Sequence, residues 1–211
     1  VLVIDDDRAG RHLIQTALQE EGYRVLQAAD ARGLEVARLQ QPAVILLDEP
    51  FSSLDTKLRE STRLELRTLQ QQVGFTAILV THDQAEALSI SDRIAVMNEG
   101  RLEQVGTPRD IYHVPASLFV ADFIGHANRV DGGVVRPETM RIVVRSTPGA
   151  VPATVESCAF QGGSSQLLVR TGNGVILSIP ADDRQATQYS PGSPVWVTWP
   201  PEAVIRFGEK P

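Results

Sequence analysis

The fold is decided by one stretch of the chain, Ile45-Leu46-Leu47-Asp48-Glu49-Pro50. The apolar run that begins at Val44 stops at two adjacent carboxylates, and a proline follows. Such a run is typical of a buried parallel strand with its charged residues at the C-terminal end. Open α/β sheets bind their ligands at that edge. The stretch therefore predicts a central strand with functional carboxylates at its end.

The composition excludes several classes of protein. The 211 residues are 42% hydrophobic, and the net charge of −6 comes without a cluster of lysine or arginine, so nucleic-acid binding is not expected. Cys158 is the only cysteine, which excludes an internal disulfide and fits a reducing compartment. No apolar run approaches the roughly 18 residues of a membrane span. The first residues, from Val1 to Asp5, are typical of a strand rather than a signal peptide, and the absence of an initial Met is compatible with a start inside a longer chain.

Before residue 42, strand and helix patterns alternate. An apolar strand over 1–4 precedes a helix that stops at Gly22, and a strand over 23–26 precedes a helix that ends at Pro42. This β-α-β-α order predicts that the strand at 43–48 pairs in parallel beside the first strand. We therefore expect an α/β fold over about 1–125, with a mostly parallel sheet flanked by helices.

Two acidic motifs stand at predicted strand ends, Val3-Ile4-Asp5-Asp6-Asp7 and Leu46-Leu47-Asp48. With the strand-helix order, they resemble the first part of a response-regulator receiver domain. The resemblance implies that Asp5 and Asp6 hold Mg²⁺, that Asp48 accepts a phosphoryl group, and that Thr81 lies beside it. Converging carboxylates suit a hard cation. The lysine of that family is absent, since the strand at 93–97 ends in Asn98. Acids at a helix N-terminus also occur for the helix dipole alone.

A longer series of motifs begins at residue 45. It comprises Ile45-Leu46-Leu47-Asp48-Glu49-Pro50-Phe51-Ser52-Ser53-Leu54-Asp55, Val80-Thr81-His82-Asp83-Gln84-Ala85-Glu86-Ala87-Leu88, Ser91-Asp92-Arg93-Ile94-Ala95-Val96-Met97, and Phe119-Val120-Ala121-Asp122-Phe123-Ile124-Gly125. In order and spacing these resemble the Walker B strand, D-loop, H-loop, hairpin and closing helices of importer-type ABC transporter ATPases. Continuous agreement of this length is far more specific than any single motif.

This second resemblance implies a nucleotide site. ATP hydrolysis needs a metal anchor, a base that orients water and a group that senses the γ-phosphate. By resemblance, Asp48 would hold Mg²⁺ through water, Glu49 would polarise the attacking water, and His82 would contact the γ-phosphate of ATP. Asp55 would lie in the D-loop at a dimer interface. The family also implies a membrane permease as partner, a possible homodimer, and a cytoplasmic location, peripheral at the inner face of the membrane.

The last third of the chain is rich in short strands. They are expected at 154–160, 166–170, 175–179, 195–199 and 203–207, separated by glycine- and proline-containing turns. This spacing predicts a small β-barrel-like, OB-like domain over about 128–211. The motifs Val134-Val135-Arg136-Pro137-Glu138 and Trp199-Pro200-Pro201-Glu202-Ala203-Val204 resemble the TOBE domain of the same importers. Aromatic and basic residues are too sparse for a groove that stacks nucleic-acid bases.

The phosphate-holding motifs of an ABC ATPase are absent. The sequence contains no Gly-x-x-x-x-Gly-Lys-Ser/Thr, no Leu-Ser-Gly-Gly-Gln and no Q-loop. We therefore expect weak or no ATP turnover by this chain alone. Both resemblances place apolar-Leu-Leu-Asp on a central strand, which predicts a fusion with segments 1–42, 43–125 and 128–211. Three functions stay open: an importer ATP-binding component, a phosphoryl-accepting switch, and a non-catalytic scaffold.

Overall fold

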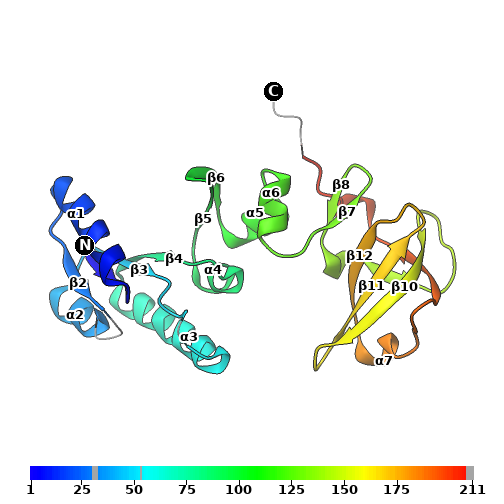
Figure 1. Ribbon diagram of the computed structural model, residues 1–211, viewed down its shortest axis with the longest axis horizontal. Coiled ribbons are helices and arrows are strands. Elements are labelled where there is room, and N and C mark those ends of the chain that lie inside the picture. Colours follow the sequence, from blue (N-terminus) through cyan, green and yellow to red (C-terminus); the bar gives the residue numbers. More distant parts are fainter. Residues whose placement is uncertain (30–32, 53, 208–211) are drawn as a thin grey trace. The chain divides into compact units, whose positions relative to one another are not determined.

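The chain forms two compact units, 1–92 and 93–211 (Figure 1). A computed structural model describes residues 1–29, 33–52 and 54–207. Ser53 of the predicted D-loop lies outside these described residues. The predicted domain boundaries at residues 42 and 125 stay predictions.

The first unit alternates strands and helices. In chain order its elements are β1 (Leu2–Ile4), α1 (Arg8–Glu20), β2 (Leu26–Ala28), α2 (Gly33–Gln40), β3 (Val44–Asp48), α3 (Thr56–Val73), β4 (Thr76–Val80) and α4 (Gln84–Ile90).

The strands of this unit form one parallel sheet in the order β2-β1-β3-β4. The register places Leu2 opposite Ile45 and Leu47 opposite Leu79, so the predicted parallel pairing of the first and third strands is confirmed. Leu2, Ile45 and Leu47 are buried in a core that also holds Phe51. Alternate residues of β3 therefore lie in this core, and Asp48 stands at the C-terminal end of the strand.

Local signals set the helix ends. Asp7 caps α1, since its carboxylate accepts hydrogen bonds from Ala9 N and Gly10 N. Gly74 closes α3 in the left-handed conformation with φ 77°, which glycine adopts without steric cost. The strand predicted at 23–26 begins later, at Leu26, because the end of α1 continues into a turn in which Tyr23 N donates to Leu18 O at 3.0 Å.

The second unit begins with a hairpin and two short helices and continues as a β domain. Its elements are β5 (Ile94–Asn98), β6 (Arg101–Gly106), α5 (Pro108–His113), α6 (Leu118–Phe123), β7 (Asn128–Val130), β8 (Gly133–Val135), the 3₁₀ helix η1 (Pro137–Thr139), β9 (Arg141–Val143), β10 (Val151–Phe160), β11 (Ser165–Thr171), β12 (Ile176–Ala181), α7 (Asp183–Ala186), β13 (Pro194–Thr198) and the 3₁₀ helix η2 (Pro201–Ala203).

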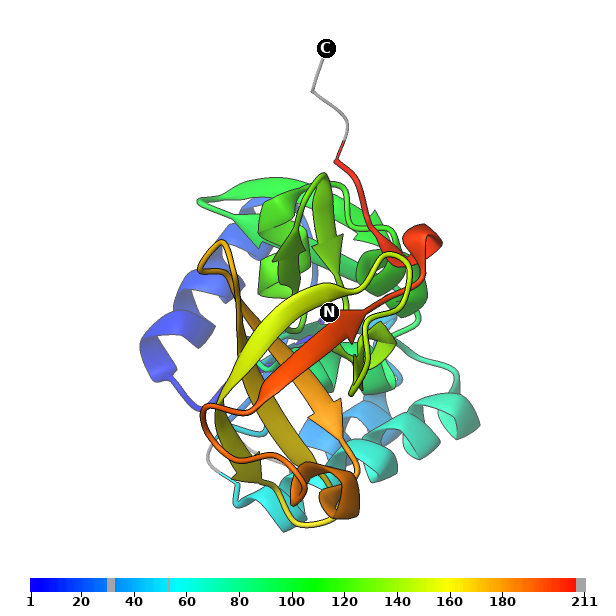
Figure 2. The same ribbon diagram turned by 90° about the vertical axis from the view of Figure 1, so that its right-hand side faces the viewer.

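Five of these strands form an antiparallel sheet in the order β12-β11-β10-β13-β9, which Figure 2 shows in yellow-green to red. Alternate residues of β11 and β13, such as Leu167, Val169 and Val197, are fully buried in the core. The strand predicted at 203–207 is wrong. Pro200 and Pro201 begin the 3₁₀ helix η2 just before this segment, and within 203–207 only Ile205 forms a β-bridge, to Val134.

Candidate active site

The predicted site residues follow the adjacent strands β3 and β4. Asp48 lies opposite Val80 in the parallel ladder, and Glu49 N donates to Val80 O at 2.9 Å. Glu49 has a positive φ of 43°, which is uncommon for a residue with a side chain. The chain therefore turns sharply at Glu49, and its side chain and the loop after β4 meet at the same edge of the sheet.

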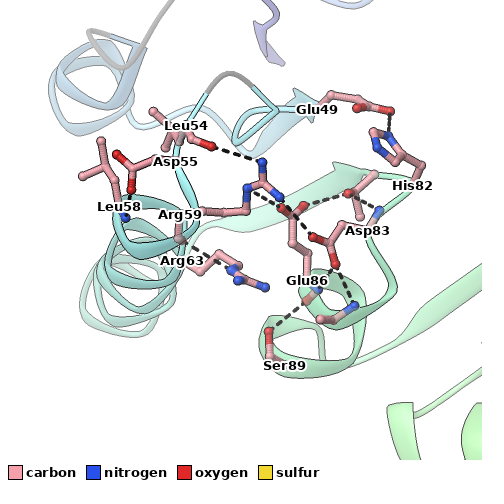
Figure 3. A network of polar contacts seen from close by, with 12 residues as sticks. Glu49, Leu54, Asp55, Leu58, Arg59, Arg63, His82, Asp83, Glu86 and Ser89 are labelled. Atoms are coloured by element: carbon pink, nitrogen blue, oxygen red, sulfur yellow. Dashed lines mark hydrogen bonds and ion pairs between the residues drawn. The ribbon is translucent and has the colours of Figure 1, made fainter. Parts of the chain in front are cut away.

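Glu49 and His82 contact each other (Figure 3). The distance from His82 Nδ1 to Glu49 Oε1 is 2.6 Å, and the side chains are 78% and 38% exposed, respectively. The hydrogen bond to Glu49, followed by the charge of that carboxylate, raises the pKa of His82. The structure thus brings together the two residues that the sequence predicts as catalytic, although 33 positions separate them.

Asp48 lies among like charges. Burial, followed by the charges of Asp5, Glu49 and Asp6, raises the pKa of the Asp48 carboxyl. Asp5 is buried at the end of β1, where its Oδ1 accepts from Asp7 N at 2.7 Å, and Asp6 is exposed. Within the described ranges, no three His, Cys, Asp or Glu side chains come together so as to hold a metal ion. The Mg²⁺ ligands Asp5, Asp6 and Asp48 therefore stay a prediction.

Two further predicted residues have structural partners. Thr81 Oγ1 donates to Glu86 Oε2 at 2.7 Å and accepts from Asp83 N at 3.0 Å. Asp55 is exposed and caps α3, since its Oδ1 accepts from Leu58 N at 3.0 Å. Phosphoacceptor and dimer-interface roles for Thr81 and Asp55 stay predictions.

Arg59 and Glu86 also belong to the site, and the sequence reasoning missed both. The Arg59 guanidinium on α3 lies 3.5 Å from Asp83 Oδ2 and 3.9 Å from Glu86 Oε1, and Glu86 is only 3% exposed. No spacing rule links a residue on one helix to residues on the next. The available signal was the acidic residue Glu86 in the first turn of α4, and the helix dipole alone also favours an acid at that position.

A small pocket lies at the same place. Its volume is about 60 Å³, and Glu49, Ser52, Arg59 and the side chains of Thr81, His82, Asp83 and Glu86 line it. Sites that enclose a drug-sized ligand have volumes of roughly 300–1,000 Å³. The pocket therefore accommodates a water molecule or a single small group, and it does not enclose a nucleotide.

Comparisons with known proteins give the ancestry. The TOBE domain family model matches residues 133–207. The uncharacterized ABC transporter ATP-binding protein YdcT of Escherichia coli is 40% identical over 211 aligned residues, which cover 91% of this chain and 60% of the relative. The spermidine/putrescine import ATP-binding protein PotA of Rubrobacter xylanophilus is 38% identical over 82% of this chain and 56% of its own length. The Fe(3+) ions import ATP-binding protein FbpC of Agrobacterium fabrum is 44% identical over 79% of this chain and 48% of its own length.

A solved structure of the molybdate-binding protein ModG matches 34% of this chain and 57% of the ModG chain at 12% identity. Its TM-score of 0.32 is too low to bear on the fold.

The match to YdcT covers 91% of this chain, so about 9% of the chain lies outside it. The receiver-like segment 1–42 is longer than that remainder, so the match extends into this segment. The receiver resemblance therefore stays a prediction.

No described helix is long and apolar enough to cross a membrane. The chain spans between 48% and 60% of the length of the three relatives named above. The match at 133–207 confirms the predicted TOBE domain, and the relatives confirm the predicted resemblance to importer-type ABC transporter ATP-binding proteins. The chain is therefore a homologue of the ATP-binding proteins of ABC-type importers and carries a TOBE domain.

Proposed function

We propose that the chain is an ATP-binding component of an ABC-type solute importer and that it carries the water-activating part of the site. The observation that carries this proposal is the 2.6 Å contact between Glu49 and His82 at the ends of adjacent parallel strands. A carboxylate that orients water and a histidine that senses phosphate have to converge on one substrate. The relatives support the proposal, because their names are those of import ATP-binding proteins.

In this proposal each predicted residue keeps its role. Glu49 polarises the attacking water and His82 contacts the γ-phosphate. Asp48 holds Mg²⁺ through water. Burial and then the neighbouring carboxylates raise the pKa of Asp48, and a cation there would relieve the repulsion between these carboxylates. Asp55 faces a dimer partner. Magnesium, when bound, would neutralise charge that develops on the phosphates.

The pocket beside Glu49 and His82 does not by itself enclose ATP. The sequence has no P-loop, and the pocket of about 60 Å³ is far too small for a nucleotide. Positioning and charge stabilisation are most of phosphoryl-transfer catalysis. We therefore expect little or no turnover by the isolated chain. The proposal includes a permease partner, a possible homodimer and a peripheral location at the cytoplasmic face of the membrane. The relatives carry different solutes in their names, so no solute is proposed.

Thermal unfolding of the purified chain tests the proposal. The midpoint is compared in Mg²⁺ alone, in Mg-ATP, and in Mg²⁺ with beryllofluoride. A ligand that binds only the folded chain at about 100 times its Kd adds roughly 2.7 kcal/mol, which is a measurable shift. A shift that is specific to Mg-ATP and lost in Asp48→Asn supports nucleotide binding. The absence of any shift beyond Mg²⁺ alone contradicts it and favours an inherited fold with a scaffold role.

A second candidate is a receiver-like switch that accepts a phosphoryl group on Asp48. The sheet order β2-β1-β3-β4 favours it, because doubly wound folds of the flavodoxin type have this order. The raised pKa of Asp48 beside Asp5 and Asp6 also fits a set of acidic residues around a cation. A midpoint shift specific to beryllofluoride, a phosphoryl analogue, would support this candidate over the first.

A further inference from the structure

Arg59 joins two parts of the site that are distant in the sequence (Figure 3). At one end, Arg59 Nη2 donates to Leu54 O at 3.1 Å. Leu54 belongs to the turn after Glu49, where Ser52 N donates to Glu49 O at 3.1 Å. At the other end, Arg59 Nη1 lies 3.5 Å from Asp83 Oδ2. One guanidinium therefore bridges the turn that follows Glu49 and the loop that follows β4.

The same network holds both neighbours of His82. Asp83 lies directly against Arg59. Thr81 is held through Glu86, whose Oε1 faces Arg59 at 3.9 Å and whose Oε2 accepts from Thr81 Oγ1 at 2.7 Å. Asp83 N closes the loop by donating to Thr81 Oγ1 at 3.0 Å. The backbone of His82 is thus fixed from both sides by groups that lead back to Arg59.

His82 itself has little else to hold it. Its side chain is 78% exposed, and among the described residues its side-chain hydrogen bond is the one to Glu49. Exposed ion pairs are weak and lose side-chain entropy when they form, so this contact depends on where the loop is placed. The Glu86 carboxylate, by contrast, is buried at 4% side-chain exposure, and a buried charge needs its partner.

We propose that Arg59 is a positioning residue, which sets the contact between His82 and Glu49 by tying the turn after Glu49 to the loop that carries His82. The inference deepens the proposed function, since that function gives the pair its role. The geometry itself does not depend on ATP. Arg59 touches neither His82 nor Glu49 through a hydrogen bond in the described residues, so it acts through Leu54, Asp83 and Glu86.

The experiment is an NMR titration of the His82 imidazole in the full chain, without nucleotide. The charged groups around His82 are the carboxylates of Glu49, Asp83 and Glu86 and the guanidinium of Arg59. Removing Arg59 takes away a cation, which by direct electrostatics raises the His82 pKa. Losing the Glu49 contact lowers it. The two explanations therefore predict shifts of opposite sign.

We expect Arg59→Met to lower the His82 pKa by at least half as much as Glu49→Gln lowers it. In the double variant, Arg59→Met should add little to the decrease that Glu49→Gln causes. Arg63→Met is the matched control, because Arg63 lies one turn further along α3 and bonds the carbonyl of Arg59. It should leave the His82 pKa unchanged. If Arg59→Met raises this pKa or leaves it unchanged, the proposal is wrong.

A second variant keeps the test decisive if Arg59→Met does not fold. Thr81→Val removes the hydroxyl that links the loop to Glu86 and leaves Arg59 in place. We expect the same downward shift of the His82 pKa, and an unchanged pKa would overturn the proposal. Because no nucleotide is present, this result is independent of the Mg-ATP unfolding test. Each of the two proposals can therefore fail while the other holds.

Discussion

Arg136→Met removes a buried cation from the second unit. Arg136 is 3% exposed and follows β8. Its guanidinium donates to Tyr112 O at 3.0 and 3.2 Å, to Ala121 O at 2.8 Å and to His126 O at 3.2 Å. It also lies 4.1 Å from the centre of the Tyr112 ring. Tyr112 and Ala121 are in the last turns of α5 and α6, where a helix leaves its carbonyls unpaired.

The expected loss follows from these contacts. Methionine fills much of the space but has no donor, so the carbonyls of Tyr112, Ala121 and His126 lose a partner. A hydrogen bond to a charged group contributes about 1.5–3 kcal/mol, and bonds that share one donor group are not additive. The equivalent of about two such bonds gives an expected fall in the free energy of unfolding of this unit of about 3–5 kcal/mol. At roughly 4 °C per kcal/mol, the midpoint should fall by about 12–20 °C.

Calorimetry and urea unfolding of the full chain provide the assay. Arg141→Met is the control, because Arg141 is exposed and donates to the carbonyls of Glu138 and Met140. It should change the unfolding free energy by no more than about 0.5 kcal/mol. A loss below about 1 kcal/mol in Arg136→Met would refute the reasoning, since the carbonyls would then find other partners at little cost.

Three further changes test other parts of the chain. Asp48→Asn should raise the unfolding midpoint at neutral pH, because burial and neighbouring carboxylates raise the pKa of Asp48 and so disfavour its charged form in the folded chain. The gain should vanish below the unfolded pKa of 3.8, where the Asp48 carboxyl is neutral in the folded and in the unfolded chain, and thermal unfolding at several pH values would show this. Gly133→Ala should lose about 1–3 kcal/mol in urea unfolding, since a Cβ would lie 2.1 Å from Ile205 O. Asn128→Leu should cost about 1–3 kcal/mol for each backbone group of Ser178 left unpaired, because the Asn128 side chain makes hydrogen bonds of 2.7 Å to both Ser178 O and Ser178 N. Amide hydrogen exchange at Ser178 would locate the loss, and unchanged protection of this amide would contradict the prediction.

Much of the fold followed from local patterns. The parallel placement of β3 beside β1 came from its apolar run and the β-α-β order, and the left-handed C-cap of α3 came from Gly74. Element ends were less predictable. The turn after α1 delays β2 to Leu26, and the bulge near Val155 lies in a strand that extends from Val151 to Phe160. These ends depend on hydrogen bonds with neighbouring segments, which periodicity does not contain.

The site was predictable as a set of residues but not as a network. Asp48, Glu49 and His82 were recognisable because they stand in specific motifs at strand ends. Their meeting follows from parallel pairing, since the C-terminal ends of adjacent parallel strands share one edge. By contrast, no motif indicated that the Arg59 guanidinium would bridge Leu54 and Asp83.

The sequence by itself determined which residues stand at the ends of β3 and β4, because strand patterning and motif spacing are properties of short segments. Only the tertiary structure decided that Glu86 would be buried against Arg59 and that His82 would remain exposed while touching Glu49. The physical reason is that the contact between Arg59 and Glu86 depends on how α3 packs beside α4. Helix packing follows the shapes of whole helix surfaces, and the spacing of two residues along the chain does not define it.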